Sequence, residues 1–338
     1  MAELTVSAGL ARGLLELAVS KGADRAQLLA RAGIAEDDLA DVDTRIPLAK
    51  YVTLTRAGKV MTKDPALALH YGETSNFAEI SIVGLIGAAS ETMAEAFQQL
   101  NRYGRLVIEF DGGPERFGME PGADGIWIVD KREHPNDFYE LTESTFARMI
   151  CGPRAFGVEK LAKAVQVTHA RPDYADEVAR VFAAPVTYDA PRNAVLIDYK
   201  WTDHRIQTQP RYSFGVLSRH ADQLLQELEA SKSVRGRVES LLMPVLHKGD
   251  ASMDAIAEKL AMSRQTLFRR LKEEGTSFEK VLDALRRRLA VDYLSARKVS
   301  VNETAYLVGF SDPAAFSRAF KRWTGKSPAA FRTGTDGR

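Results

Sequence analysis

The chain has 338 residues, a single cysteine and a formal net charge of +1, and its composition is that of an ordinary globular protein with room for two cores. One cysteine excludes an internal disulfide framework and a cysteine-based metal site, and the six histidines include no metal-binding pair at helical spacing. No secretory signal begins the chain, and the longest apolar run (80–89) is about half of a bilayer span, so we expect a soluble cytoplasmic protein without membrane, metal or cofactor.

Helical patterns dominate the first 215 residues. Leucines spaced for one helix face, with Gly22 and Gly33 as breaks, predict helices between residues 10 and 34. Four further helices are predicted from apolar periodicity and cap residues, over 47–60, 93–104, 137–150 and 172–182.

Short strands interrupt these helices. Alternating apolar and polar residues predict a three-stranded meander at 106–110, 115–120 and 125–130, with turns at 111–113 and 121–122. A strand is also predicted at 164–169, and a hairpin is predicted from 186–189 with 194–199. The expected fold of this half is therefore α+β, helix-rich with a small mixed or antiparallel sheet.

Strand signals disappear after about Gly215. A helix through Leu224, Leu225 and Leu228 leads into the polar stretch 230–233, where we place a domain boundary. We therefore predict three parts: a first domain at 1–215, a linker helix at 216–230, and an all-α domain at 231–338.

Capping residues divide the last third into short helices. Ser263 precedes one helix, and Asp312 followed by proline begins another. Residues 276–279 and 300–303 read as capping boxes. These signals predict two helix-turn-helix pairs, 253–260 with 263–273 and 301–308 with 313–323, joined by a helix over 278–296.

This arrangement favours DNA binding. The second helix of each pair is amphipathic, and a connecting helix of about 19 residues, roughly 28 Å long, suits two recognition helices about one DNA turn (34–36 Å) apart. Residues 231–338 hold 21 Lys and Arg against 12 Asp and Glu, a balance of +9, whereas residues 1–230 have a balance of −8. The basic excess thus coincides with the predicted helix-turn-helix pairs.

Two stretches resemble the AraC/XylS-type regulators: SVNETAYLVGFSDPAAFSRAFKRWTGKSPAAFR (300–332) and MSRQTLFRRLKEEGTSF (262–278). Less strongly, Ile80 to Arg105, including TMAEAFQQLNRYGRL, resembles the arabinose-binding-domain-like effector domain of the ornithine-utilisation and virulence regulators. The helix-rich pattern differs from the β-barrel of the arabinose regulator itself, so the resemblance does not imply a sugar effector. It implies an effector-sensing domain at 1–215 and a DNA-binding domain at 231–338.

The resemblance also implies DNA contacts. Base contacts are expected from Gln265, Phe268 and Arg269 in the first motif and from Ala314, Ser317 and Arg318 in the second. Instead of contacting a base, Phe268 could pack against the core, and Arg318 could have a structural role over the core. Phosphate contacts are expected from Arg270, Lys272, Arg286, Arg287, Lys321 and Arg322, with only one or two of Arg286, Arg287 and Arg288 reaching the backbone.

The function that follows is an effector-responsive transcription regulator, most simply an activator, with promoter DNA and, by resemblance, RNA polymerase as partners. A homodimer is left open. By analogy the effector is an amino acid such as ornithine or arginine, or a fatty or aromatic acid, and no residue is assigned to its pocket. The alternative is a constitutive DNA-binding protein whose first half only dimerises. An enzyme is not expected, because no acid–base constellation stands out, and Cys151 is expected to be a buried structural thiol.

Overall fold

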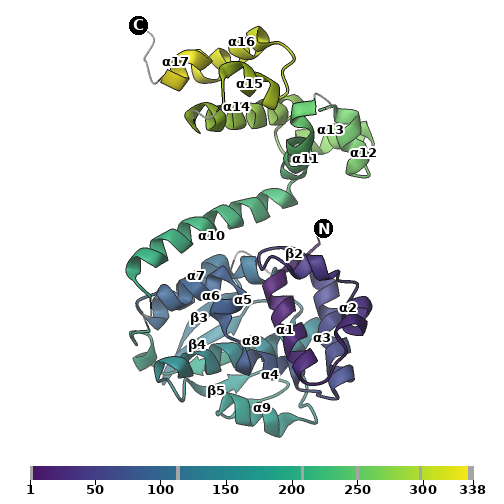
Figure 1. The fold of residues 1–338 in the computed structure, drawn as a ribbon. Helices are drawn as coiled ribbons and strands as arrows, with labels where there is room; N and C mark the ends of the chain where they lie inside the picture. Colours follow the sequence, from purple (N-terminus) through teal and green to yellow (C-terminus); the bar gives the residue numbers. More distant parts are fainter. Residues whose placement is uncertain (1–2, 112–114, 207–208, 249–250, 297–298, 334–338) are drawn as a thin grey trace. The chain divides into compact units, whose positions relative to one another are not determined.

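The computed structural model describes residues 3–111, 115–206, 209–248, 251–296 and 299–333, and it separates into an N-terminal unit, Met1–Leu225, and a C-terminal unit, Gln226–Arg338 (Figure 1). Helix α10 (Arg211–Lys232) runs across the division. Part of the turn predicted at 111–113 lies outside the described residues. Within the described ranges, no helix combines the length and the apolar content that crossing a bilayer requires.

Nine α-helices are described in the N-terminal unit before α10: α1 (Ala8–Ser20), α2 (Arg25–Ala32), α3 (Leu48–Thr62), α4 (Leu67–Thr74), α5 (Phe77–Ile80), α6 (Ile82–Ala89), α7 (Met93–Val107), α8 (Tyr139–Cys151) and α9 (Ala175–Phe182). Short 3₁₀ turns, η1 to η4, lie at Glu36–Leu39, Pro135–Phe138, Gly152–Phe156 and Tyr199–Trp201. Side-chain caps begin several helices; the Ser7 hydroxyl accepts from the Leu10 N–H, and Thr92 accepts from Glu95. The predicted helices are confirmed, with ends that differ by a few residues.

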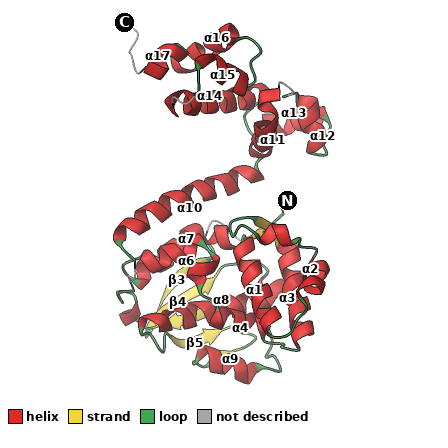
Figure 2. Cartoon of the chain, in the orientation of Figure 1, coloured by secondary structure: helices red, strands yellow, loops and turns green. Residues whose placement is uncertain are grey.

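Two sheets lie in the same unit. Strands β1 (Thr5–Ser7) and β2 (Arg45–Pro47) form an antiparallel pair. The larger sheet has the order β3-β4-β7-β5-β6, from β3 (Phe117–Gly122), β4 (Gly125–Asp130), β5 (Ala162–Gln166), β6 (Val186–Thr187) and β7 (Asn193–Ile197). Only β5 and β6 run parallel; the other neighbours are antiparallel. The helix-rich α+β prediction is confirmed, and the strands are confined to this unit among the described residues (Figure 2).

Two strand predictions were wrong. The apolar run at 106–110 is not a strand of the meander, because Leu106 and Val107 end α7 and continue the buried stripe that includes Tyr103; only Ile108 makes an isolated bridge, to Val6. The segments at 186–189 and 194–199 do not form a hairpin, because β5 lies between β6 and β7. Helix α9 connects β5 to β6, and such a crossover brings the second strand back parallel to the first.

The main core of this unit packs the sheet against α8. Phe146, Val165 and Val195 have no measurable exposure there. Helices α4 and α8 approach closely because Gly72 has no side chain: a Cβ at that position would lie 2.1 Å from the Ser144 carbonyl oxygen. This close approach brings the end of α4 beside the last turns of α8.

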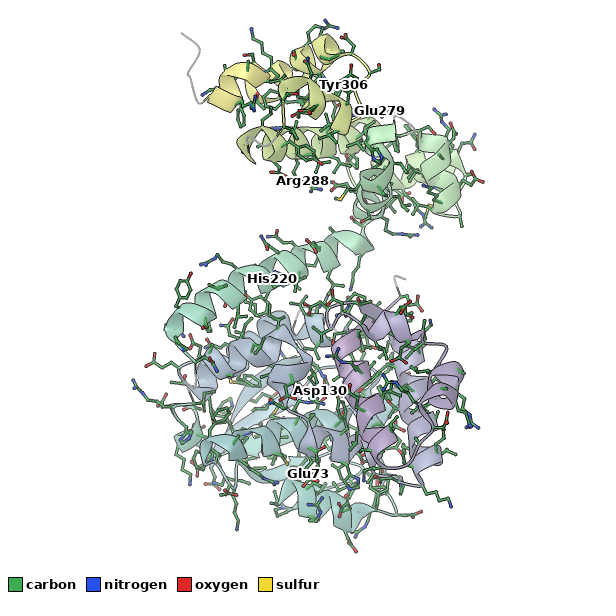
Figure 3. All side chains as sticks on the ribbon, viewed as in Figure 1. Glu73, Asp130, His220, Glu279, Arg288 and Tyr306 are labelled. Atoms are coloured by element: carbon green, nitrogen blue, oxygen red, sulfur yellow. The ribbon has the colours of Figure 1, made fainter. Side chains whose placement is uncertain are left out.

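A buried ion cluster closes one end of the sheet. The carboxylate of Asp130, the last residue of β4, accepts from Arg116 Nη2 at 3.1 Å and from Arg132 Nε at 2.9 Å, and all three side chains are buried (Figure 3 labels Asp130). Thr145 and Thr142 accept further bonds from the two arginines. Although burial acts to raise it, the two guanidinium charges hold the pKa of Asp130 below its usual value.

The C-terminal unit contains the end of α10 followed by α11 (Val234–Leu242), the 3₁₀ turn η5 (Met243–Lys248), α12 (Met253–Lys259), α13 (Arg264–Glu273), α14 (Phe278–Ala296), α15 (Val301–Leu307), α16 (Pro313–Thr324) and α17 (Pro328–Thr333). Ser263 and Asp312 cap α13 and α16, and Ser300 with Glu303 forms the capping box of α15, as predicted. At α14 the Lys280 N–H donates to Ser277 rather than to Thr276, so the capping box predicted at 276–279 is wrong by one residue. All the described secondary structure here is helical.

Candidate nucleic-acid interface and cavity

Helix α13 has one buried face and one exposed face. Leu267 and Leu271 lie in the core of the C-terminal unit, whereas Gln265, Phe268 and Arg269 are exposed. Phe268 is 57% exposed, so it does not pack into the core, which was the alternative prediction from the sequence. The Arg269 side chain is 72% exposed, and its Nε lies 3.8 Å from Glu273. The three residues predicted to read bases thus share one solvent-facing surface.

Helix α16 repeats this pattern. Phe316 and Phe320 are fully buried, while Ala314 and Arg318 are exposed and Ser317 is half-buried. The Arg318 side chain is 74% exposed and lies 3.9 Å from Asp312, its only described ion-pair partner, so it does not cover the core. Hydrogen bonds from the Ala314 and Ala315 N–H groups lower the pKa of Asp312, which keeps the helix cap charged.

The two helices present their residues at matching positions. In each, the predicted base-reading residues stand two, five and six places after the cap residue, Ser263 or Asp312. Helix α14, with 19 residues, connects the two motifs. Its Arg286 donates to the carbonyl oxygens of Val308 and Gly309, both at 3.1 Å, and stacks on Phe310. Arg286 therefore fastens the second motif to α14, and burial lowers its pKa.

The other cations predicted to meet phosphate are exposed: Arg270, Lys272, Arg287, Lys321 and Arg322. Arg322 lies 3.2 Å from Asp283, and Arg288 lies 3.4 Å from Glu239. Glu274, at the end of α13, accepts from the N–H groups of Val234 and Arg235, which fixes the first motif to α11. Figure 3 labels Arg288 on α14 and Tyr306 on α15.

The N-terminal unit contains a cavity of about 490 Å³ that sequence reasoning missed. It lies between the sheet and helices α4 to α8, and its volume is typical of small-molecule sites. One wall is the apolar stripe of α7, with Met93, Phe97 and Leu100; strands β3, β4 and β7 contribute Met119, Ile126, Ile128 and Ile197. The sequence feature that could have indicated the cavity is the pair of glycines in the apolar segment 82–89. In the structure, Gly87 leaves open space where a side chain would stand.

Arg148 of α8 lines the same cavity. Its Nε donates to the Ser75 hydroxyl at 3.1 Å, and its guanidinium stacks on the rings of Tyr71 and Phe77. The Nη2 atom is buried and has no hydrogen-bond partner among the described residues. No described carboxylate lies within ion-pair distance of this guanidinium. Glu73, the acidic residue in the wall (Figure 3), is instead held by both Nη atoms of Arg180, at 2.8 and 2.7 Å.

Cys151 lies at the end of α8, beside the same cavity. It is buried, as predicted, and its thiol contacts the Val181 carbonyl oxygen at 3.5 Å. Burial raises its pKa, which keeps the thiol protonated and unreactive at neutral pH. A separate surface group, Asp111, Glu133 and His134, places its ligand atoms within 4.8 Å of one another. Glu133 and His134 are exposed and Asp111 is half-buried, so none of the three is a buried ligand.

The segment 199–206 connects the cavity to α10. Its residues Trp201, Thr202 and Ile206 line the cavity, and its backbone is hydrogen-bonded to the start of α7 through Met93, Ala94 and Glu91. Five residues further on, Arg211 at the start of α10 forms a two-pronged ion pair with Glu95 of α7, at 2.7 and 2.8 Å. Segment 199–206 and Arg211 of α10 are therefore both bonded to the beginning of α7.

Comparison with known proteins matches both units. Residues 22–206 match the family model of the arabinose-binding domain of AraC transcription regulators, and residues 256–334 match a helix-turn-helix domain. The ornithine utilization regulator of Pseudomonas aeruginosa is 27% identical, with 97% of this chain and 96% of that protein aligned. The regulator VirS of Mycobacterium tuberculosis is 24% identical over 96% of each chain. The crystal structure of the regulator CdpR from P. aeruginosa aligns with 91% of this chain and 96% of its own at 19% identity, with a TM-score of 0.41.

Proposed function

Because this chain belongs to the AraC family of DNA-binding transcription regulators, we propose that it is an effector-responsive regulator, and most simply an activator, which reads two successive major grooves of promoter DNA. The observation that carries the proposal is the pair of helices α13 and α16, which expose residues at matching positions after their caps. It acts where the chromosome is accessible, in the cytoplasm. RNA polymerase as a partner and assembly into a homodimer are parts of the proposal that rest on the family alone.

The proposed base contacts are those of the two exposed faces. Arg269 and Arg318 have the length and the fork of donors that pair with guanine, and Gln265 matches adenine. Phe268 is placed to contact a thymine methyl group. Pro313, Ala314 and Ala315 provide no hydrogen-bonding side chains at the start of α16, so we propose that the first motif contributes more sequence discrimination than the second.

Phosphate contacts are proposed for Arg270, Lys272, Arg287, Lys321 and Arg322. Arg286 is left out, because its guanidinium already donates to two carbonyl oxygens within the unit. The proposed domain division remains that of a sensing domain at 1–215, a linker helix at 216–230 and a DNA-binding domain at 231–338. Helix α10 extends the helical linker to Arg211–Lys232.

The proposed signal route begins at the cavity. A ligand there would touch Trp201, Thr202 and Ile206. The segment that holds these residues is hydrogen-bonded to the beginning of α7, and α7 is bonded to α10 through Glu95 and Arg211. A ligand regulates only if it binds one state of this segment more tightly than another. The cavity favours effector sensing over the constitutive alternative, in which the N-terminal unit would only dimerise.

The experiment that tests the proposal is selection of bound duplexes from a random DNA pool with the full-length protein. Two conserved blocks about one helical turn apart are expected, because two recognition helices in one chain enter successive major grooves. A single block would remove the second motif from sequence reading. The absence of enrichment at low salt, both alone and with extracts of small metabolites added, would contradict the proposal.

Replacing Arg269 by alanine is expected to relax sequence preference at one base position by about 1–3 kcal/mol, because one bidentate base contact is lost. Binding to the selected site and to each single-base variant of it is compared for both proteins. The neighbouring Arg270→Ala substitution is the matched control, since loss of a phosphate contact weakens all these sites about equally. Uniform weakening by Arg269→Ala would contradict its base-reading role.

Replacing Lys321 by alanine is expected to weaken binding to every sequence and to lower the slope of log K against log salt by about one. The reason is that one counterion fewer is released when the protein neutralises one phosphate fewer. The slope is measured by titration at several salt concentrations. Lys163→Ala, an exposed lysine in the N-terminal unit, should leave the slope unchanged; an unchanged slope for Lys321→Ala would remove it from the phosphate contacts.

A further inference from the structure

We propose that the effector is a monocarboxylate with an apolar body, whose carboxylate binds Arg148 and whose body fills the cavity beside α7. This inference rests on the proposed function, because it names the ligand of the proposed sensing domain. Its evidence is the composition of the cavity wall, the unpaired guanidinium in that wall, and the way in which the other polar groups are already used.

The apolar body of the ligand is inferred from the side chains that line the cavity. Met93, Phe97 and Leu100 of α7 are each only half-buried although they pack against the core. Ile126 and Trp201, which line the same cavity, are also half-buried. Apolar surface left uncovered in a concave site is stabilised by an apolar ligand, because covering it releases water. A sugar or another polyol would leave its hydroxyl groups without partners against these side chains.

The carboxylate group of the ligand is inferred from the Arg148 side chain. A guanidinium has five N–H donors; the Nε of Arg148 donates to Ser75, and its Nη2 has no hydrogen-bond partner among the described residues. The rings of Tyr71 and Phe77 lie 5.1 and 5.6 Å from its Cζ and hold the guanidinium in place, and no described carboxylate pairs with its charge. A fixed, planar cation at the edge of an apolar cavity binds a carboxylate through charge-assisted hydrogen bonds.

The remaining polar groups of the wall make an amino acid a poorer ligand. Its ammonium group would need acceptors, but Glu73 is occupied on both oxygens by Arg180. The hydroxyl groups of Thr74 and Thr202 donate to backbone carbonyls and are uncharged, so they are weaker partners for an ammonium group than a carboxylate. A second ammonium group, as in ornithine, would add a further charge that the apolar wall does not solvate.

The test measures binding to the full-length protein without DNA, by calorimetry and by the fluorescence of Trp201, which lines the cavity. The probes are octanoate and 3-phenylpropanoate, their neutral alcohols octan-1-ol and 3-phenylpropan-1-ol, and L-ornithine. At least one acid is expected to bind at least about tenfold more tightly than its alcohol, the range that a charge-assisted hydrogen bond provides. Which acid binds better distinguishes an aliphatic from an aromatic effector. Ornithine is expected not to bind.

Two variants separate the roles of charge and shape. Arg148→Gln should weaken the acid about tenfold and abolish its advantage over the alcohol, whereas Arg148→Lys should restore part of that advantage. Gly87→Leu should weaken acid and alcohol alike, because its side chain would fill the cavity without a clash at Cβ, and leucine favours the helix. Arg171→Gln, at an exposed arginine outside the cavity wall, is the matched control and should change nothing.

Three results would overturn the inference: an alcohol that binds the wild type as tightly as its acid, an acid preference that survives in Arg148→Gln, or no binding of either acid. None of these results bears on DNA recognition, which is measured separately by selection from the random DNA pool. Conversely, an acid that binds through Arg148 in a protein that enriches no DNA sequence, with or without that acid, would leave the ligand assignment standing and contradict the proposed function.

Discussion

Replacing Asp130 by alanine is expected to lower the free energy of unfolding of the N-terminal unit by about 3–5 kcal/mol, because it leaves the buried guanidinium groups of Arg116 and Arg132 without their shared carboxylate. The loss is measured by urea unfolding. Glu91→Gln is the control, since it breaks an ion pair with Arg205 whose side chains are largely exposed, and such pairs contribute about 0–1 kcal/mol. Equal effects of the two substitutions would contradict the structural role of the cluster.

The same cluster predicts how stability depends on pH. The two arginines depress the pKa of Asp130 in the folded protein despite its burial, whereas the unfolded carboxyl titrates near about 3.9. A carboxyl group whose pKa is lower in the folded than in the unfolded protein stabilises the fold at pH values above the unfolded pKa. This stabilisation is lost as the pH falls toward the pKa of the folded protein. The stability difference between wild type and Asp130→Asn should therefore be largest above about pH 4 and shrink below it. A difference that grows on acidification would be the wrong sign.

Replacing Phe316 by alanine is expected to cost about 3–5 kcal/mol in the C-terminal unit, because a fully buried ring leaves a cavity between Phe310 and Phe320. The second motif should lose its fixed position, so binding to the DNA block that it reads should fall more than binding to the block of the first motif. Trp323 packs edge-on against Phe310 and reports unfolding by fluorescence in a chain with W127F and W201F.

The matched control is Phe268→Ala. Phe268 belongs to the equivalent helix of the first motif, but its ring is exposed, so its loss should change stability little. It should instead weaken binding where a thymine methyl is contacted. If Phe316→Ala left stability unchanged, the packing described for the second motif would be wrong; if it weakened both DNA blocks equally, the two motifs would not act independently.

The helix-turn-helix unit was predictable because its signals are local. Ser263, Ser300 and Asp312 satisfy the free N–H groups of the helices that they precede, and such bonds span only two or three residues. The same short range explains the misplaced cap at α14, where Thr276 and Ser277 are adjacent and chemically alike. Base-reading and phosphate-contacting roles are still predictions, because they depend on DNA.

The strand order of the sheet and the cavity were harder to predict from the sequence. The apolar run AVLI marks β7 as a strand, but it does not say that β4 and β5 are its neighbours, since pairing across the chain is set by tertiary packing. The cavity is assembled from five helices, three strands and the segment after β7. Arg148 looks in the sequence like any polar position of a helix. Only the close approach of α4 and α8 at Gly72 places it beside Ser75 and the apolar wall.

The order of strands also bears on synthesis. The centre of the larger sheet is β7, which is the last of its five strands to leave the ribosome. Until Asn193–Ile197 has emerged, the nascent chain holds β3 with β4 and β5 with β6 as separate pairs, each with an unpaired inner edge. A chain that stalls before this strand exposes both edges and lacks Val195 from the core, so ribosome stalling in this stretch should produce aggregation-prone fragments.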